Sequence, residues 1–191
     1  VGKPSVCVAV LDTGIFDAHT DLSANLLPGY DFIDNDTDPS APPTFDKIST
    51  HGTHVAGTVA ALGNNRFGVV GVAFKSRVVP VRVLGPGSTQ LTLVKAIRWA
   101  AGLSVTGVPD NANACKVINM SLGTISKGNC TAGPFPSIQE AVDAAEAAGV
   151  VVVAAAGNEA QACPAPQSSS PANLNNVISV AAVTPSGVRA V

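Results

Sequence analysis

Residues 6–14 read VCVAVLDTG, an apolar run that ends in an aspartate, a threonine and a glycine. The run is continuously apolar and does not alternate, so a strand made from it needs cover on both faces. Such strands are typical of a parallel sheet that lies between layers of helices. This stretch therefore favours an α/β fold, and it places Asp12 at the carboxyl end of the first strand.

Apolar runs and helical patterns alternate along the rest of the chain. Further strands are predicted at residues 78–84, 116–120, 150–155 and 177–183. Helices are predicted at residues 51–62, 91–101 and 137–148, with Ser49-Thr50 as a cap for the first and Gly149 as the end of the last. We expect a three-layer α/β fold: a mostly parallel, twisted sheet with helices on both faces and functional loops beyond the carboxyl ends of the strands.

Length and composition are those of one domain, or most of one, over residues 1–191. Hydrophobic residues make up 46% of the chain, which is enough for one substantial core. Only 13% of residues are charged, the formal net charge is -2 and the basic residues are scattered, which argues against nucleic acid and anionic membranes as partners. No apolar run approaches the roughly 20 residues that span a bilayer, so we expect a soluble chain. The start at Val1 lacks a signal peptide, as expected of a processed or cut chain.

The chain has four cysteines, Cys7, Cys115, Cys130 and Cys163, without a CxxC pair or a Cys/His cluster. Two disulfides formed in an oxidising compartment explain this pattern better than a metal site does. The alternative is four buried thiols that act as small apolar side chains. The sequence leaves three disulfide connectivities open.

Three polar residues follow predicted strands or begin a predicted helix. Asp12 stands before a turn glycine, and His51 begins the segment HGTHVAGT, where its imidazole is a candidate general base. His54 lies three positions on; without a HExxH glutamate a zinc pair is disfavoured, and we expect His54 to pack or cap. Asn158 follows the strand 150–155 and can donate a hydrogen bond to an oxyanion. Each of these residues, taken alone, is also ordinary turn or packing chemistry.

Four motifs together resemble the subtilase family in order and spacing. They are DTGI at 12–15 with His19 and DL at 21–22, the His51 segment, NMSLG at 119–123 and AAGN at 155–158. The resemblance implies that Asp12 orients His51, that His51 acts as general base and then acid, and that Asn158 helps to hold the oxyanion. The family's Gly-Thr-Ser-Met-Ala segment, which carries the nucleophilic serine, does not occur in this sequence. We expect a partial subtilisin-like peptidase domain that is incomplete at both ends.

The resemblance also implies where a substrate binds. An extended polypeptide would pair between Gly85-Pro86-Gly87 and Ser121-Leu122-Gly123. The pocket for the residue before the scissile bond would be walled by Gly123, Thr124, Ala155, Ala156 and Gly157, and a second apolar pocket by Leu91 and Leu122. Large apolar side chains should be accepted; Thr124 narrows the mouth, and Glu159 at the rim admits Lys or Arg. The alternative is ordinary loop glycine and core leucine.

Calcium is the cofactor that the resemblance implies. The expected ligands are the side chains of Asp21 and Asn65 and the carbonyls of Gly63, Phe67 and Val69. A second acidic cluster, Asp34, Asp36 and Asp38, is interpreted as a solvated loop. The family's strand order pairs Cys7 with Cys115, which leaves Cys130 for Cys163.

The leading prediction is a secreted serine endopeptidase that hydrolyses peptide bonds through an Asp-His-Ser triad, with the serine outside this chain, so that the chain alone is inactive. The alternative is a catalytically inactive, subtilase-like peptide-binding protein. A nucleotide-binding domain is disfavoured, because residues 12–16 lack the GxGxxG spacing. Expected partners are an extended polypeptide substrate and a propeptide or protein inhibitor. The complete protein is expected to be a monomer. The fragment is expected to be poorly soluble because it exposes apolar surface.

Overall fold

The computed structural model describes residues 1–41, 50–123, 135–158 and 169–190. Its sheet has six strands in the order β2-β3-β1-β4-β5-β6, and every neighbouring pair is parallel. The strands are β1 (Cys7–Asp12), β2 (Tyr30–Asp31), β3 (Arg77–Arg82), β4 (Val117–Met120), β5 (Val151–Ala155) and β6 (Val177–Val180). The α-helices are α1 (His51–Ala60), α2 (Gln90–Ala100) and α3 (Pro136–Ala147), and η1 (Ser23–Asn25) is a 3-10 helix. The α/β class predicted from the apolar runs is confirmed.

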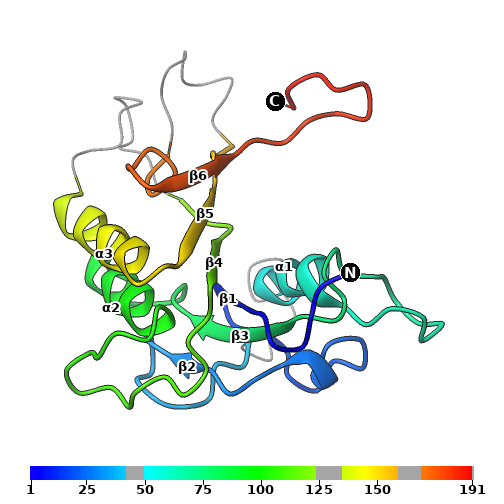
Figure 1. The fold of residues 1–191 in the computed structure, drawn as a ribbon, viewed down its shortest axis with the longest axis horizontal. Helices are drawn as coiled ribbons and strands as arrows, with labels where there is room; N and C mark the ends of the chain where they lie inside the picture. Colours follow the sequence, from blue (N-terminus) through cyan, green and yellow to red (C-terminus); the bar gives the residue numbers. More distant parts are fainter. Residues whose placement is uncertain (42–49, 124–134, 159–168, 191) are drawn as a thin grey trace.

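Helices cover both faces of the sheet and make three layers (Figure 1). α1 lies on one face, and α2 and α3 lie side by side on the other. Side chains of β1 divide accordingly: Ala9 and Leu11 belong to the core under α2 and α3, whereas Val10 belongs to a smaller core under α1. All three are fully buried, which is why residues 9–11 are apolar.

The structure differs from the sequence prediction at several boundaries. β2 has two residues and η1 has three, too few for any periodicity to reveal them. β6 ends at Val180, not at residue 183, and most of its residues are exposed. Thr50 is the N-cap of α1, as expected, but its side chain makes no capping hydrogen bond; Ser49 lies outside the described residues. α3 ends at Ala147, and Gly149 follows with φ +74°, the left-handed conformation expected at a helix end.

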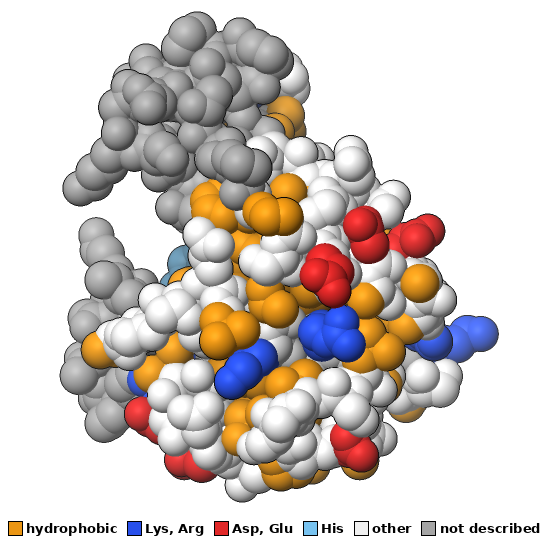
Figure 2. All heavy atoms as spheres, turned by 90° about the vertical axis from the view of Figure 1, so that its left-hand side faces the viewer, with side chains coloured by type: hydrophobic (Ala, Val, Ile, Leu, Met, Phe, Trp, Pro, Cys, Tyr) orange, Lys and Arg blue, Asp and Glu red, His pale blue; other side chains and the backbone are white. Residues whose placement is uncertain are grey.

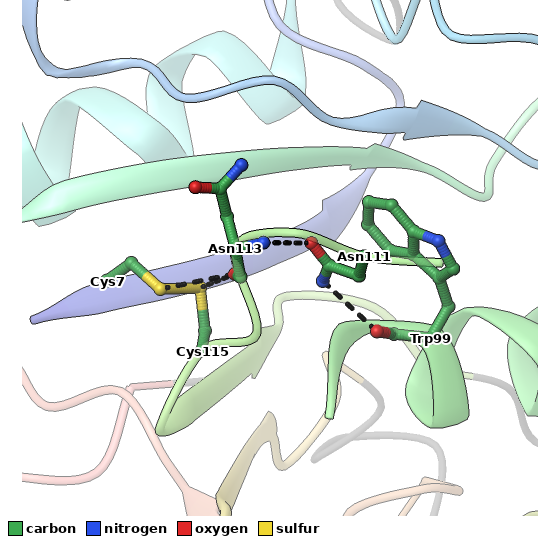
Figure 3. The surroundings of a disulfide bond; sticks show 5 residues. All are labelled: Cys7, Trp99, Asn111, Asn113 and Cys115. Atoms are coloured by element: carbon green, nitrogen blue, oxygen red, sulfur yellow. Dashed lines mark hydrogen bonds between the residues drawn. A yellow bond between two sulfur atoms is a disulfide. The ribbon is translucent and has the colours of Figure 1, made fainter. Parts of the chain in front are cut away.

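A disulfide joins the amino ends of two neighbouring strands. Cys7 begins β1, and Cys115 precedes β4, with 5.0 Å between the two Cα atoms (Figure 3). The carbonyl oxygen of Asn113 lies 3.5 Å from Cys7 Sγ and 3.4 Å from Cys115 Sγ. Asn111 ties the same loop to α2 through a hydrogen bond from its Nδ2 to the carbonyl of Trp99. The pairing of Cys7 with Cys115 is thus confirmed, whereas Cys130 and Cys163 lie outside the described residues.

Charged side chains do not gather into a single field on the face shown in Figure 2. Acidic and basic groups appear there as separate small clusters among apolar and uncharged side chains. In the described part of the chain, no helix has the length and apolar character needed to cross a membrane.

Candidate active site

Asp12 and His51 meet at the carboxyl edge of the sheet. Asp12 is the last residue of β1 and is fully buried, and His51 is the first residue of α1. The Nδ1 atom of His51 lies 2.7 Å from Oδ1 of Asp12, and the His51 side chain stays 43% exposed. A buried carboxylate on Nδ1 fixes the ring and leaves Nε2 as the nitrogen that faces outward. The pair therefore has the geometry of an oriented general base.

Backbone contacts hold α1 against the end of β1. The amide of Gly52 donates to Oγ1 of Thr13 at 3.0 Å, and the amide of Thr13 donates to Oδ1 of Asp12 at 2.8 Å. A methyl group at Gly52 would overlap the carbonyl oxygen of Gly14. The absence of a side chain at position 52 is thus what lets the helix bring His51 to hydrogen-bonding distance.

A cavity of about 790 Å³ opens in front of His51. Asn158, which follows β5, lines it together with His51, and so do Ser121, Leu122 and Gly123 beyond the end of β4. A concave site with mostly apolar walls and a few convergent polar groups is the usual form of a binding site. The cavity thus unites three predicted elements: the base, the amide donor and one edge segment for substrate.

Other predicted substrate residues lie around this cavity without lining it. Gly85, Pro86 and Gly87 form an exposed turn, and their neighbours Leu84 and Ser88 line the cavity in their place. Leu91 is 60% exposed on the first turn of α2 and also does not line it. Ala155, Ala156 and Gly157 lie at the end of β5, next to Asn158 but outside the lining. Thr124 and Glu159 fall outside the described residues.

Several lining residues of the cavity were not predicted as site residues, among them Val83, Leu84, Ser88, Thr89 and Gln90. Leu93 of α2, Phe135 and Ile138 at the start of α3, and Ser170 line the side away from α1. Ser170 is 2% exposed, and its hydroxyl has no hydrogen-bond partner among the described residues. The helical spacing of Leu93 and Ile138 looks the same as that of core residues, so no sequence signal separates the two roles.

Asp21 and the loop 63–69 come together as predicted. The Asp21 side chain is 1% exposed; its Oδ1 accepts from Nδ2 of Asn65 at 2.5 Å and its Oδ2 from the amide of Val69 at 2.9 Å. No Lys or Arg in the described part of the chain forms an ion pair with it. Both carboxylate oxygens of Asp21 thus accept from N–H donors, and the amide nitrogen of Asn65 faces the carboxylate. Gly63 and Phe67 belong to the same loop, and Phe67 donates its amide to Oδ1 of Asn65 at 3.2 Å.

His54 was expected to pack or cap, but its side chain is not packed. It is exposed on α1 and lines a second cavity of about 690 Å³ on the outer side of that helix. Within the described ranges, no group of three or more His, Cys, Asp and Glu side chains is placed to hold a metal ion.

Comparison with known proteins adds independent evidence. The model of the subtilase family (peptidase S8) matches residues 3–191. The chain is 45% identical to an extracellular protease of Xanthomonas campestris pv. campestris, over 96% of this chain and 34% of that protein. It is 40% identical to subtilisin E of Bacillus subtilis, over 97% of this chain and 43% of that protein. A solved protease structure from Pseudoalteromonas arctica superposes with a TM-score of 0.80 at 42% identity, covering 95% of this chain and 57% of that one.

The chain thus spans between 34% and 57% of the length of these relatives. The family match, in contrast, extends over nearly the whole of this chain, and it includes both members of the Asp12–His51 pair. The sequence motifs, the parallel sheet and the family match all agree, and the chain belongs to the subtilase family.

Proposed function

We propose that this chain is the Asp- and His-bearing part of a serine endopeptidase, whose nucleophilic serine lies outside residues 1–191. The observation that supports it most is the 2.7 Å contact between His51 Nδ1 and Asp12 Oδ1 at the mouth of a cavity of about 790 Å³. His51 would take the serine proton during attack on the peptide carbonyl and return it to the leaving amine. Asp12 would hold the ring and stabilise the imidazolium.

Asn158 would stabilise the oxygen of the reacting carbonyl. It lines the same cavity as His51, where its amide can donate to the oxygen that becomes negative in the tetrahedral intermediate. A donor of this kind contributes roughly 3 to 4 kcal/mol to transition-state stabilisation. The segment Ser121-Leu122-Gly123 would present backbone groups to an extended polypeptide, with Gly85-Pro86-Gly87 as the facing edge.

The proposal includes secretion of the enzyme, its calcium ion and its partners. The Cys7–Cys115 disulfide and the relatives named extracellular proteases support secretion. Asp21, Asn65 and the carbonyls of Gly63, Phe67 and Val69 would hold a structural calcium ion, which would brace this loop. Beyond the polypeptide substrate, a propeptide or protein inhibitor would occupy the same cleft, and the complete protein would act as a monomer.

A fluorophosphonate probe tests the proposal on the complete protein that contains this chain. Labelling of a serine beyond residue 191, together with hydrolysis of an unfolded protein substrate, is the expected result. Asp12→Asn should lower kcat about 10⁴-fold and slow labelling, because the His51 ring loses its orienting carboxylate. Asp17→Asn, an exposed carboxylate five residues away, is the matched control and should leave both rates unchanged. Absence of labelling and hydrolysis, with tight peptide binding, would instead indicate an inactive peptide-binding relative.

A further inference from the structure

Three charged side chains form a row across neighbouring strands beside the active site. Arg82 ends β3, where it is in register with Asp12 of β1 on one side and with Asp31 of β2 on the other. Residues in register on parallel strands point to the same face, which here is the face that carries α1. Asp12 is 0%, Asp31 1% and Arg82 9% exposed, so the row is buried.

Arg82 binds the loop that follows β2. Its Nη1 donates to Oδ2 of Asp31 at 2.6 Å and to Oδ2 of Asp34 at 2.7 Å. The other oxygen of Asp31 accepts from the amides of Ile33 at 2.6 Å and Asp34 at 3.1 Å. Burial by itself lowers the pKa of Arg82, but its hydrogen bonds and charge interactions with Asp31 and Asp34 outweigh this, and the pKa is raised. Arg82 is therefore a permanent cation that closes this loop.

The same loop returns to the turn that follows Asp12. The amide of Ile15 donates to the carbonyl of Pro39 at 3.1 Å, and the amide of Ala41 donates to the carbonyl of Ile15 at 3.2 Å. A methyl group at Gly14 would lie 2.9 Å from the carbonyl oxygens of both Pro39 and Ser40. Gly14 in turn contacts the first turn of α1 at Gly52. Loop, turn and helix start are closely packed, so a shift of the loop would displace the turn 13–15, which lies between the end of β1 and the start of α1.

We propose that Arg82 is a positioning residue for the Asp12–His51 pair. It neutralises Asp31 and Asp34 and thereby holds loop 31–41 against the turn on which His51 depends. Without it, the two carboxylates would face each other as unpaired charges, one of them buried, and their repulsion would open the loop. The inference rests on the peptidase function proposed above, since it concerns the geometry of that site.

The test compares Arg82→Met with Arg77→Met in the complete protein. Arg77 lies at the other end of β3 and donates from Nη1 to the carbonyl of Ala24, so it controls for the loss of an arginine from the same strand without the loss of an ion pair. We expect Arg82→Met to lower kcat at least tenfold with KM changed by less than about twofold, because a small misplacement of the base slows the chemical step. Arg82→Lys should recover part of this loss, and Arg77→Met should keep the wild-type kcat.

The far-downfield ¹H NMR signal of the proton between His51 Nδ1 and Asp12 Oδ1 gives a readout that does not depend on turnover. It should broaden or vanish in Arg82→Met and persist in Arg77→Met. If the wild-type protein shows this signal but no hydrolysis, the peptidase proposal fails while the positioning role is still tested by the same spectra.

Two milder variants test the proposal even when Arg82→Met does not fold. Asp34 is 63% exposed, so Asp34→Asn should fold normally, weaken one of the two Arg82 contacts and lower kcat by a smaller factor. Asp36→Asn in the same loop, whose carboxylate accepts from the amide of Asp38, should leave kcat unchanged. A wild-type kcat and an unchanged downfield signal in folded Arg82→Met, or equal losses in Asp34→Asn and Asp36→Asn, would overturn the proposal.

Discussion

Gly52 is the residue on which the approach of α1 to the strand end depends. It is the second residue of the helix, and a methyl group there would overlap the carbonyl oxygen of Gly14 and lie 3.1 Å from the Asp12 side chain. Gly52→Ala should therefore push His51 away from Asp12. We expect kcat of the complete enzyme to fall by about 10²-fold, the effect of a displacement of roughly 1 Å at a reacting group.

Gly57 provides the control for this prediction, because it lies in the same helix and is also buried. Among the described residues, nothing lies within 4 Å of a methyl group placed at Gly57. Gly57→Ala should keep kcat and stabilise the protein by roughly 0.5 to 1 kcal/mol, since alanine is the better helix former. Steady-state kinetics and thermal unfolding of both variants check the prediction, and equal kinetics in the two would contradict it.

Tyr30 makes the free energy of unfolding depend on pH in the alkaline range. Its side chain is 3% exposed, and burial, followed by the charges of Asp36 and Asp31, raises its pKa. A group whose pKa is raised in the folded state contributes stability below its unfolded pKa of about 10 and loses it as pH rises through the folded pKa. Unfolding in urea at pH 8 and pH 11 should show a smaller loss for Tyr30→Phe than for the wild type. Equal losses would show that Tyr30 does not titrate differently in the two states.

Among the elements, β1 and β4 are joined covalently as well as by their backbone ladder. The disulfide Cys7–Cys115 closes a loop over a sequence separation of 108. A cross-link that closes a loop of this length restricts the unfolded chain, and this loss of unfolded-state entropy stabilises the folded protein by about 4 to 5 kcal/mol. Removing it by Cys7→Ala with Cys115→Ala should lower the free energy of unfolding by up to this amount, measured in urea. Cys115→Ala alone should lose nearly as much, and a change below about 1 kcal/mol in both would contradict the relation here.

The strands also show why residues 6–11, 78–84, 116–120 and 150–155 were recognisable. Each strand has neighbours on both edges, and its inward side chains belong to the core under α2 and α3; α1 covers the other face only at β1 and β3, and Val151 of β5 is 45% exposed. β2 is different, because it contributes only Tyr30 and Asp31 and one of these is charged. Beside its backbone pairing with β3 lies the Arg82–Asp31 contact, which connects residues 51 positions apart and leaves no local pattern.

At the scale of the whole molecule, the sheet ends in an exposed apolar strand. Ile178 and Val180 of β6 are 54% and 51% exposed. An exposed strand edge with apolar side chains promotes pairing with other chains. The 191-residue chain on its own should therefore self-associate, measured by sedimentation velocity. Val180→Lys should reduce association more than Val188→Lys, which changes a valine that is 64% exposed outside the strand; the reverse order would refute the role of β6.

Sequence alone determined the layers of this protein and the residues proposed to carry its chemistry. Continuous apolar runs identify strands covered on both faces, and Asp12, His51 and Asn158 stand at strand ends or a helix start that can be read locally. The tertiary structure decided what those residues meet: the 2.7 Å contact of His51 with Asp12, the overlap that requires glycine at position 52, and the lining of the cavity by Leu93, Phe135 and Ile138. The buried cation Arg82 likewise became visible only there. These features arise where segments far apart in the chain converge. The periodicity of side chains shows which face of a helix or strand is buried, but it does not show which other element covers that face.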